Sequence, residues 1–310
     1  MTNTIGFPNL GIKLEINRVA FTIFSHSVYW YGIIIGIGFI LAVMFALYRR
    51  KKYAVSADNI FDFVLIGLPS AIVGARLVYV LGDSSCRGDI MSIIAIWDGG
   101  LSIFGGLSFA VLSCLIYLKK KKMNILRTLD FAAPSFMIGQ IIGRWGNFVN
   151  AEVYGRETNS FLKMSINSEP GVHPLFLYES LLMLIGFFAL VYYSPKRKRN
   201  GEVFSLYLIW YGATRVWMEA MRDEEFVLKI FNLPLSQILA VLVILLGVFM
   251  LLYIYIKKPK QAMEKTIFAP GEFLEYESKP NEKLEEEIKI EEEIQNEKKT
   301  IPENDETNDC

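Results

Sequence analysis

Residues Val28 to Tyr48 read VYWYGIIIGIGFILAVMFALY and contain no charged side chain. At the α-helical rise of about 1.5 Å per residue, this stretch spans the roughly 30 Å hydrocarbon core of a bilayer. An uncharged run of this length is typical of a transmembrane helix and excludes a soluble globular domain. The fold class is then decided by how often such runs recur along the chain.

Further apolar runs of membrane length follow the first one. They are Phe63–Gly82, Leu101–Leu118, Phe131–Ala151, Leu175–Tyr193, Val203–Met221 and Ser236–Ile256. The sequence therefore predicts an all-α polytopic membrane protein with seven transmembrane helices. Residues 1–260 are expected to form this membrane domain, and residues 261–310 to form a separate tail.

Clusters of lysine and arginine predict how these helices cross the membrane. They follow the first, third, fifth and seventh runs, so helices that alternate in direction place all of them on one face. That face carries 16 lysines and arginines, and the opposite face carries 7. By the positive-inside rule the clustered face is cytoplasmic, which places the N-terminus outside and the C-terminus in the cytoplasm.

The formal net charge of zero combines two segments of opposite charge. From Gln261 to Cys310 the chain has 16 acidic and 6 basic residues, a charge of −10, so the first 260 residues carry +10. Such a charged tail with few aromatic residues favours disorder. We expect a disordered acidic cytoplasmic tail that the chemistry does not need.

Polar residues gather in the predicted outer half of the membrane domain. They are Trp30, Tyr31, Arg76, Asp98, Arg144, Asn147, Asn150, Glu152, His173, Tyr178, Glu179, Tyr211, Arg215 and Glu219. Ionisable residues within a membrane are costly and normally face the interior of a helix bundle. Their position in one leaflet predicts a single polar cavity that opens toward the outer face.

Structural interpretations of several of these residues stay open at this point. Arg215 and Glu219 are spaced i, i+4 and could form only an intrahelical ion pair. Trp30 and Tyr31 could belong to the aromatic belt at the membrane interface. Arg76 could extend from its helix end to the lipid headgroups.

The residue types in this cavity favour a phosphate ligand. Arg144 and Arg215 offer planar cationic groups that bind phosphate bidentately, and in this setting a phospholipid headgroup is the natural source. Glu152 and Glu219 could orient the arginines or move a proton. Motifs for nucleotide, zinc-protease or serine-hydrolase chemistry are absent from the sequence. We expect no metal, no cofactor and no nucleic-acid partner.

At these residues the sequence resembles a known family. The run Gly143–Gly155, GRWGNFVNAEVYG, closely resembles the signature G-R-x-G-N-F-x-N-x-E-x-x-G of the bacterial phosphatidylglycerol–prolipoprotein diacylglyceryl transferases. Supporting matches occur in the family's order and are WYG at 30–32, GAR at 74–76, WDGGLS at 97–102, GG at 105–106, HP at 173–174, LYE at 177–179, YG at 211–212, Arg215 and Glu219.

The resemblance implies a reaction in the bacterial cytoplasmic membrane, with an active site toward the outer face. A diacylglyceryl group would move from phosphatidylglycerol to the lipobox cysteine thiol of a prolipoprotein, forming a thioether and releasing glycerol phosphate. Catalytic roles are implied for Tyr31, Glu152, Arg215 and Glu219. Substrate binding is implied for Arg76, Arg144, Asn147, Gly155 and Tyr211.

Phe104 departs from the pattern, because many members have histidine at this position and others have tyrosine. Phenylalanine cannot accept a proton, so we expect only packing or lipid contact from it. The proton acceptor stays open between Glu152, Glu219 and the phosphate itself. A lipid transporter or a non-catalytic membrane scaffold are the alternatives from other classes, although the sequence shows no internal repeat typical of transporters.

Overall fold

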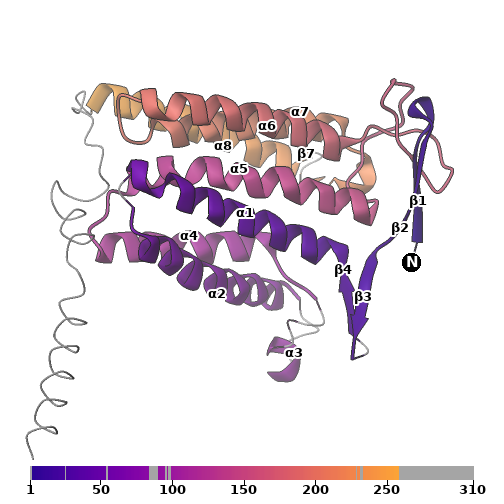
Figure 1. Ribbon diagram of the computed structural model, residues 1–310, viewed down its shortest axis with the longest axis horizontal. Coiled ribbons are helices and arrows are strands. Elements are labelled where there is room, and N and C mark those ends of the chain that lie inside the picture. The colour runs from indigo at the N-terminus through magenta and orange to yellow at the C-terminus, as the bar shows by residue number, and fades with distance from the viewer. Residues whose placement is uncertain are drawn as a thin grey trace, which may run out of the picture. The chain divides into compact units, whose positions relative to one another are not determined.

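The computed structural model describes residues 2–24, 26–53, 55–83, 90–94, 96, 99–227, 229–230 and 233–257. Trp97 and Asp98 of the predicted motif, and the acidic tail at 261–310, lie outside the described residues. Within the described residues the chain is mostly helical, and its long helices lie side by side (Figure 1).

Each predicted apolar run corresponds to one long helix. These helices are α1 (Trp30–Tyr53), α2 (Ala57–Gly82), α4 (Ile103–Lys120), α5 (Ile125–Asn150), α6 (Leu175–Tyr193), α7 (Glu202–Met221) and α8 (Leu235–Lys257), with a short α3 (Ile90–Ile94) between α2 and α4. Among the described residues, six of these helices are long and apolar enough to cross a membrane: α1, α2, α4, α5, α6 and α8. The chain therefore has the helices of a polytopic membrane protein.

Helix α7 is formed as predicted but is not among those six. The reason lies in its composition, since Glu202, Arg215 and Glu219 make it more polar than its neighbours. It nevertheless packs along α8, where Gly212 lies against the backbone of Ala240 and Gly247 of α8 lies against the backbone of Ser205. Small residues at such crossings let two helix backbones approach closely.

Local sequence signals explain where three helices begin. The side chains of Ser56, Ser102 and Asn124 are N-caps, and each accepts a hydrogen bond from the backbone N–H three residues later. Capping of this kind satisfies one of the donors left free in the first helical turn. The turns between the helices are thus specified locally and do not depend on the apolar runs alone.

Short strands are the part of the fold that the all-α prediction missed. An antiparallel sheet has the order β2–β1–β5, from Ile12–Asn17, Thr2–Phe7 and Ser165–Ile166, with Ile5 opposite Ile166. A hairpin of β3 (Val19–Ile23) and β4 (His26–Tyr29) leads directly into α1, and β6 (Lys229–Ile230) pairs with β7 (Leu233–Pro234) before α8. These strands are too short and polar to register as membrane segments.

The strands and the basic residues lie at opposite ends of the helices (Figure 1). We call the first the strand end, where β1–β4 lie beyond the start of α1. The second is the basic end, where α1, α4 and α8 finish with Arg50–Lys52, Lys119–Lys120 and Lys257.

A small core fastens the sheet to the strand end of the helices. Ile5 and Phe7 of β1 are buried with Phe148 of α5 and Phe176 of α6. The Phe148 and Phe176 rings lie 4.4 Å apart, centroid to centroid. Burying each of these side chains contributes about 1.5–3 kcal/mol. Because Phe148 follows Asn147, this core also fixes the end of α5 that carries the predicted site.

Candidate functional site

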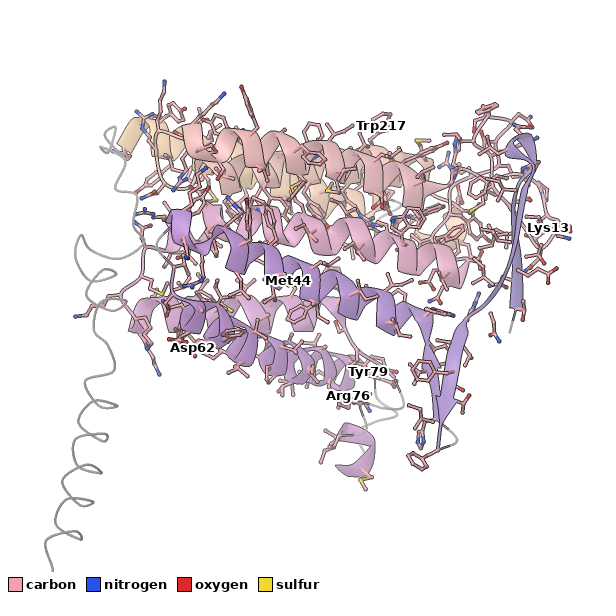
Figure 2. The ribbon with its side chains drawn as sticks, in the orientation of Figure 1. Lys13, Met44, Asp62, Arg76, Tyr79 and Trp217 are labelled. Carbon is pink, nitrogen blue, oxygen red and sulfur yellow. The ribbon has the colours of Figure 1, made fainter. Side chains whose placement is uncertain are left out.

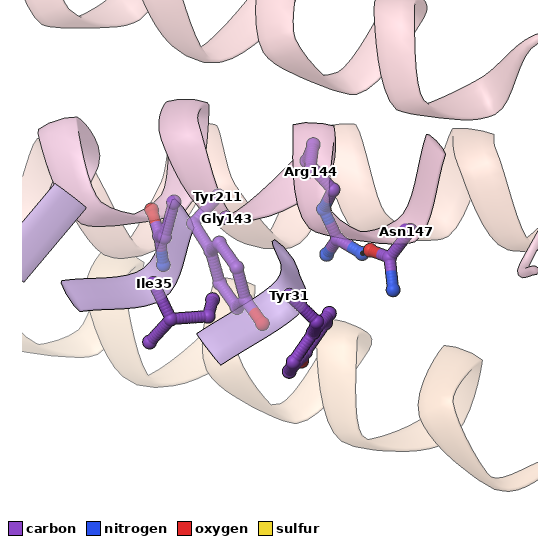
Figure 3. A pocket seen from close by; sticks show the side chains of 7 residues that line it. Tyr31, Ile35, Gly143, Arg144, Asn147 and Tyr211 are labelled. Atoms are coloured by element: carbon purple, nitrogen blue, oxygen red, sulfur yellow. Dashed lines mark hydrogen bonds between the residues drawn. The ribbon is translucent and has the colours of Figure 1, made fainter. Parts of the chain in front are cut away.

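A cavity of about 210 Å³ opens at the strand end of the helices (Figure 3). Its lining comes from three helices and consists of Tyr31 and Ile35 of α1, Gln140, Gly143, Arg144 and Asn147 of α5, and Tyr211 of α7. Four residues predicted for the site, Tyr31, Arg144, Asn147 and Tyr211, are thereby brought together. They come from positions up to 180 residues apart in the sequence.

The lining of the cavity follows from the spacing of polar residues on α5. Gln140, Gly143, Arg144 and Asn147 are spaced i, i+3, i+4 and i+7, which places them on one face of the helix. The neighbouring Gly146 lets α1 approach, because a Cβ there would lie 2.8 Å from Cδ2 of Tyr31. The same sequence run therefore supplies both the polar lining and the space for the aromatic wall.

A network of ion pairs lies behind the cavity and is centred on Glu179 of α6. We define this arginine network as Arg144, Glu179, Arg215, Glu219 and Arg222. The Nε of Arg144 is 2.6 Å from Oε2 of Glu179, whose Oε1 is 3.5 Å from Arg215 and 3.7 Å from Arg222. Glu179 is only 4% exposed, so these guanidiniums are its local environment.

Glu219 forms the second anchor of the arginine network. Its Oε2 lies 3.4 Å from both Arg215 and Arg222, and Ser236 of α8 donates a hydrogen bond of 2.6 Å to its Oε1. Arg215 and Glu219 therefore form the predicted i, i+4 pair, but Glu179 and Arg222 extend it across two further elements. An isolated intrahelical pair does not describe this site.

Arg222 is the most enclosed of the three arginines. Burial, followed by the nearby positive charge of Arg215, lowers the pKa of Arg222 to about 10. Its backbone pairs with Gly155, and a Cβ at Gly155 would lie 2.6 Å from the Cβ of His173. Gly155 thus contributes by close packing of its loop against the end of α7, and the structure places it behind Arg222.

Glu152 joins the site through amide side chains. Asn147 and Asn150 donate hydrogen bonds of 3.0 Å and 3.3 Å to its Oε1, and Arg144 approaches Asn147 Oδ1 at 3.4 Å. Helix α5 ends here because Ala151 has a positive φ of 49°, which turns Glu152 back toward Asn147. The Asn147 side chain therefore connects Glu152 to Arg144, the arginine that lines the cavity.

Arg76 lies apart from the cavity lining and holds a loop. Its guanidinium donates to the carbonyl oxygens of Ile93, Gly99 and Gly100 and lies over the ring of Tyr79 (Figure 2). These contacts attach the segment before α4 to α2. They differ from the extension to lipid headgroups that the sequence left open, and binding of substrate by Arg76 stays a prediction.

Two residues of the site, Glu179 and Arg222, had been assigned no catalytic or binding role from the sequence. Glu179 appeared only as one of many polar residues, because its three arginine partners come from distant parts of the chain. Arg222 had a local signal, since it follows Glu219 by three residues and so could share its helix face.

The remaining candidate groups are placed elsewhere. Phe104 is 55% exposed near the start of α4, and His26 contacts only the carbonyl of Phe24 among the hydrogen bonds of the described residues. Burial lowers the pKa of His173, whose carbonyl accepts from the Gly155 N–H. In the part of the chain that the structure describes, no cluster of His, Cys, Asp or Glu could hold a metal ion.

Chemically, the site is a polar cavity with cationic side chains behind it and an apolar surrounding. Arg144 is the cavity residue with a quarter of its side chain exposed, whereas Arg215 and Arg222 are more enclosed. Such an arrangement suits an anionic headgroup whose acyl chains stay in an apolar environment.

Comparison with known proteins gives a consistent result. The chain matches the family described as prolipoprotein diacylglyceryl transferase over residues 18–253. Proteins of Streptococcus pyogenes serotype M5 (strain Manfredo) and serotype M49 (strain NZ131), each named phosphatidylglycerol–prolipoprotein diacylglyceryl transferase, are 41% identical to it over 242 residues. Each alignment covers 75% of this chain and 93% of the relative.

Proposed function

The chain belongs to the prolipoprotein diacylglyceryl transferase family, and on that premise we propose that it transfers a diacylglyceryl group from phosphatidylglycerol to a prolipoprotein. The acceptor is the thiol of the lipobox cysteine, and the reaction is the first step of bacterial lipoprotein maturation. The observation that carries the proposal is the joining of the Arg144 cavity to Arg215 through Glu179.

The bond changes follow from the products. The cysteine sulfur attacks the glyceryl carbon that bears the phosphate ester, a C–S bond forms, and the C–O bond to phosphate breaks. Glycerol phosphate leaves with the electron pair of that bond. The attacking group is the thiolate, and because an unperturbed cysteine has a pKa of about 8.5, the thiol proton passes to a base.

The arginines have different parts in this proposal. Arg144, which lines the cavity, binds the headgroup phosphate of phosphatidylglycerol. Arg215 lies deeper and stabilises the negative charge that develops on the departing glycerol phosphate, with Glu219 holding it in place. A fixed cation that acts on developing charge lowers the barrier more than it strengthens substrate binding.

Polar neighbours complete the headgroup site. Asn147 lines the cavity beside Arg144, and Tyr31 and Tyr211 face it from α1 and α7, where their hydroxyls bind lipid or nucleophile. Gly155 acts through the packing of its loop. We propose that Arg76 acts indirectly, through the segment whose carbonyls it binds, in place of direct substrate binding.

The contacts of the two carboxylates bear on the proton acceptor. Glu219 is paired with two arginines and accepts a hydrogen bond from Ser236, so both of its oxygens already have partners within the chain. Among the side-chain hydrogen bonds of the described residues, Glu152 accepts from the amides of Asn147 and Asn150. We propose Glu152 or the phosphate as the acceptor.

The membrane arrangement is part of the same proposal. Helix α7 is a further span, which brings their number to seven, and its Arg215 and Glu219 face partners on α6 and on the loop after α7. The strand end is external, the basic end is cytoplasmic, and the acidic tail follows in the cytoplasm. The site then faces the compartment into which prolipoproteins are exported.

Incubation of the purified protein with phosphatidylglycerol vesicles and a lipobox peptide tests the function. We expect a peptide thioether by mass spectrometry and one equivalent of glycerol phosphate. A cysteine-to-serine peptide is the matched control and should give neither product. Movement of lipid between leaflets without either product would overturn the transferase and favour a transporter.

A further inference from the structure

Glu179 is the one residue of the arginine network that contacts arginines of both α5 and the end of α7. It pairs with Arg144 at 2.6 Å, and with Arg215 and Arg222 at 3.5 Å and 3.7 Å. It does not line the cavity, and its side chain is only 6% exposed. Its effect on a bound anion must therefore pass through the arginines that it holds.

The charges of the arginine network are unequal. Three arginines face two carboxylates, Glu179 and Glu219, which leaves an excess of one positive charge. Glu152 is not part of this network, because it accepts hydrogen bonds from the amides of Asn147 and Asn150. Each unit charge in this enclosed region strongly changes the potential at the cavity, because interactions there are screened less than in water.

The proposed reaction makes this charge balance important. Phosphatidylglycerol carries a phosphodiester with one negative charge, whereas the leaving glycerol phosphate is a monoester with a charge of about −1.5 to −2 near neutral pH. A cation that helps to bind phosphatidylglycerol binds the more highly charged glycerol phosphate more tightly. A site with too much positive charge would hold its own product.

We propose that Glu179 is a positioning residue that also limits the positive charge of the site, so that Arg144 and Arg215 bind phosphatidylglycerol and still release glycerol phosphate. The inference rests on the proposed function, which supplies the two anions. If Glu179 limits the positive charge, removal of its own charge should tighten the binding of glycerol phosphate. Loss of a merely structural residue should weaken that binding.

The test is Glu179→Gln, which keeps the shape and removes the charge. We expect the full-length variant to bind glycerol phosphate about tenfold more tightly as a product inhibitor, and its kcat to fall by about tenfold or more. A merely structural loss would weaken glycerol phosphate binding together with kcat. Weaker or unchanged product binding would therefore overturn the proposal.

A second variant separates charge from local damage. Arg222→Gln should weaken glycerol phosphate binding, and the double variant Glu179→Gln with Arg222→Gln should return the inhibition constant to near the original value, because the excess charge is again one. A double variant that binds as tightly as Glu179→Gln alone would contradict the charge-limiting role.

Two matched controls address burial and general charge. Glu202→Gln alters an equally buried glutamate at the basic end, where it binds Tyr193 and the Lys198 N–H, and Glu224→Gln alters an exposed carboxylate near the strand end. Neither should change the inhibition constant. Calorimetric binding of glycerol phosphate repeats the comparison without turnover and therefore tests the role of Glu179 independently of catalysis. Absence of thioether product in the activity assay would count against the proposed function alone.

Discussion

The two ends of the helix bundle both bury charged side chains, and only one of them has the features of a site. At the basic end we define a second group, the basic-end cluster, as Arg49, Tyr53, Asp130, Ser194 and Arg197. Asp130 is fully buried and accepts hydrogen bonds of 2.7 Å and 2.8 Å from backbone N–H groups, and Arg197 lies 3.6 Å from it.

The partners of the arginines differ between the two groups. In the basic-end cluster, Arg49 donates to the Phe131 carbonyl and to the hydroxyls of Tyr53 and Ser194, which also bond to each other. In the arginine network, the partners are carboxylates, at 2.6 Å for Arg144 and at 3.4–3.7 Å for Arg215 and Arg222. Within the described structure, atoms of Arg215, Glu219 and Arg222 lack hydrogen bonds, as does Nε of Arg197 in the basic-end cluster.

This difference shows what distinguishes a site from a structural core of charges. Buried charge alone is found at both ends, and it is satisfied at the basic end largely by backbone and hydroxyl groups. At the strand end, the ion pairs of Arg215 and Arg222, at 3.4–3.7 Å, lie behind a cavity that exposes Arg144. A ligand can improve the second arrangement, whereas the first is already bonded to its own chain.

The largest effect on activity should come from Arg144→Ala and Arg215→Ala. We expect each to lower kcat/KM for thioether formation by roughly 100- to 1000-fold, because a fixed cation for the phosphate is lost. Folding should survive, since Glu179 keeps two arginine partners in either variant. Full activity of either variant in a lipoprotein-modification assay would show that its arginine is not needed. The functional contrast between the two ends of the bundle would then be lost.

Asp130→Asn should lower the stability of the protein and leave its activity nearly unchanged. It removes the charge beside Arg197 and one of the acceptors for Gly201 and Phe204, and breaking such a buried pair costs about 3–5 kcal/mol. We expect a clear fall of the melting temperature in detergent, with near-normal kcat per folded molecule. A melting temperature like that of the parent protein would show that the basic-end cluster is not structural.

Phe104→Ala should change activity by less than about threefold, because Phe104 is half exposed at the start of α4 and can neither donate nor accept a proton. Kinetic measurement with Phe104→Tyr as the matched variant sharpens the comparison. A large loss of activity in Phe104→Ala would show that the site extends to the start of α4.

Removal of residues 263–310 should have the smallest effect. These residues lie beyond α8 and outside both groups of charges, so we expect unchanged kcat/KM for the truncated protein in membranes. The truncated chain must insert normally, which a membrane-fraction blot checks. Loss of transfer activity with normal insertion would show that the acidic tail takes part in the reaction.

Sequence reasoning reached the helices and part of the site for clear physical reasons. Apolar runs of membrane length specify helices directly, and the helical spacing from Gln140 to Asn147 places its polar residues on one face. The alternating topology grouped Tyr31 and Tyr211 with Arg144 in one leaflet, and the family resemblance supplied their expected roles.

The remainder depends on contacts between distant residues. The pairing of Glu179 with Arg144 and Arg222 requires the packing of three elements, and no local pattern encodes it. The sequence left open an extension of Arg76 to lipid, because only its position near a helix end was visible. The carbonyls that it binds belong to α3 and to the segment before α4, whose path could not be predicted.

The sheet at the strand end also sets an order of events during synthesis. Thr4 exchanges hydrogen bonds with Asn167, 163 residues later, and Ile5 is buried against Phe148 and Ile166. At a synthesis rate of about 5–20 residues per second, roughly 10–30 seconds pass between the synthesis of β1 and that of β5, whereas β2, its other partner, follows it directly. The core that fastens β1 to α5 is therefore completed only after the loop that follows α5 has been made. The cavity is completed later still, because Tyr211 of α7 lines it.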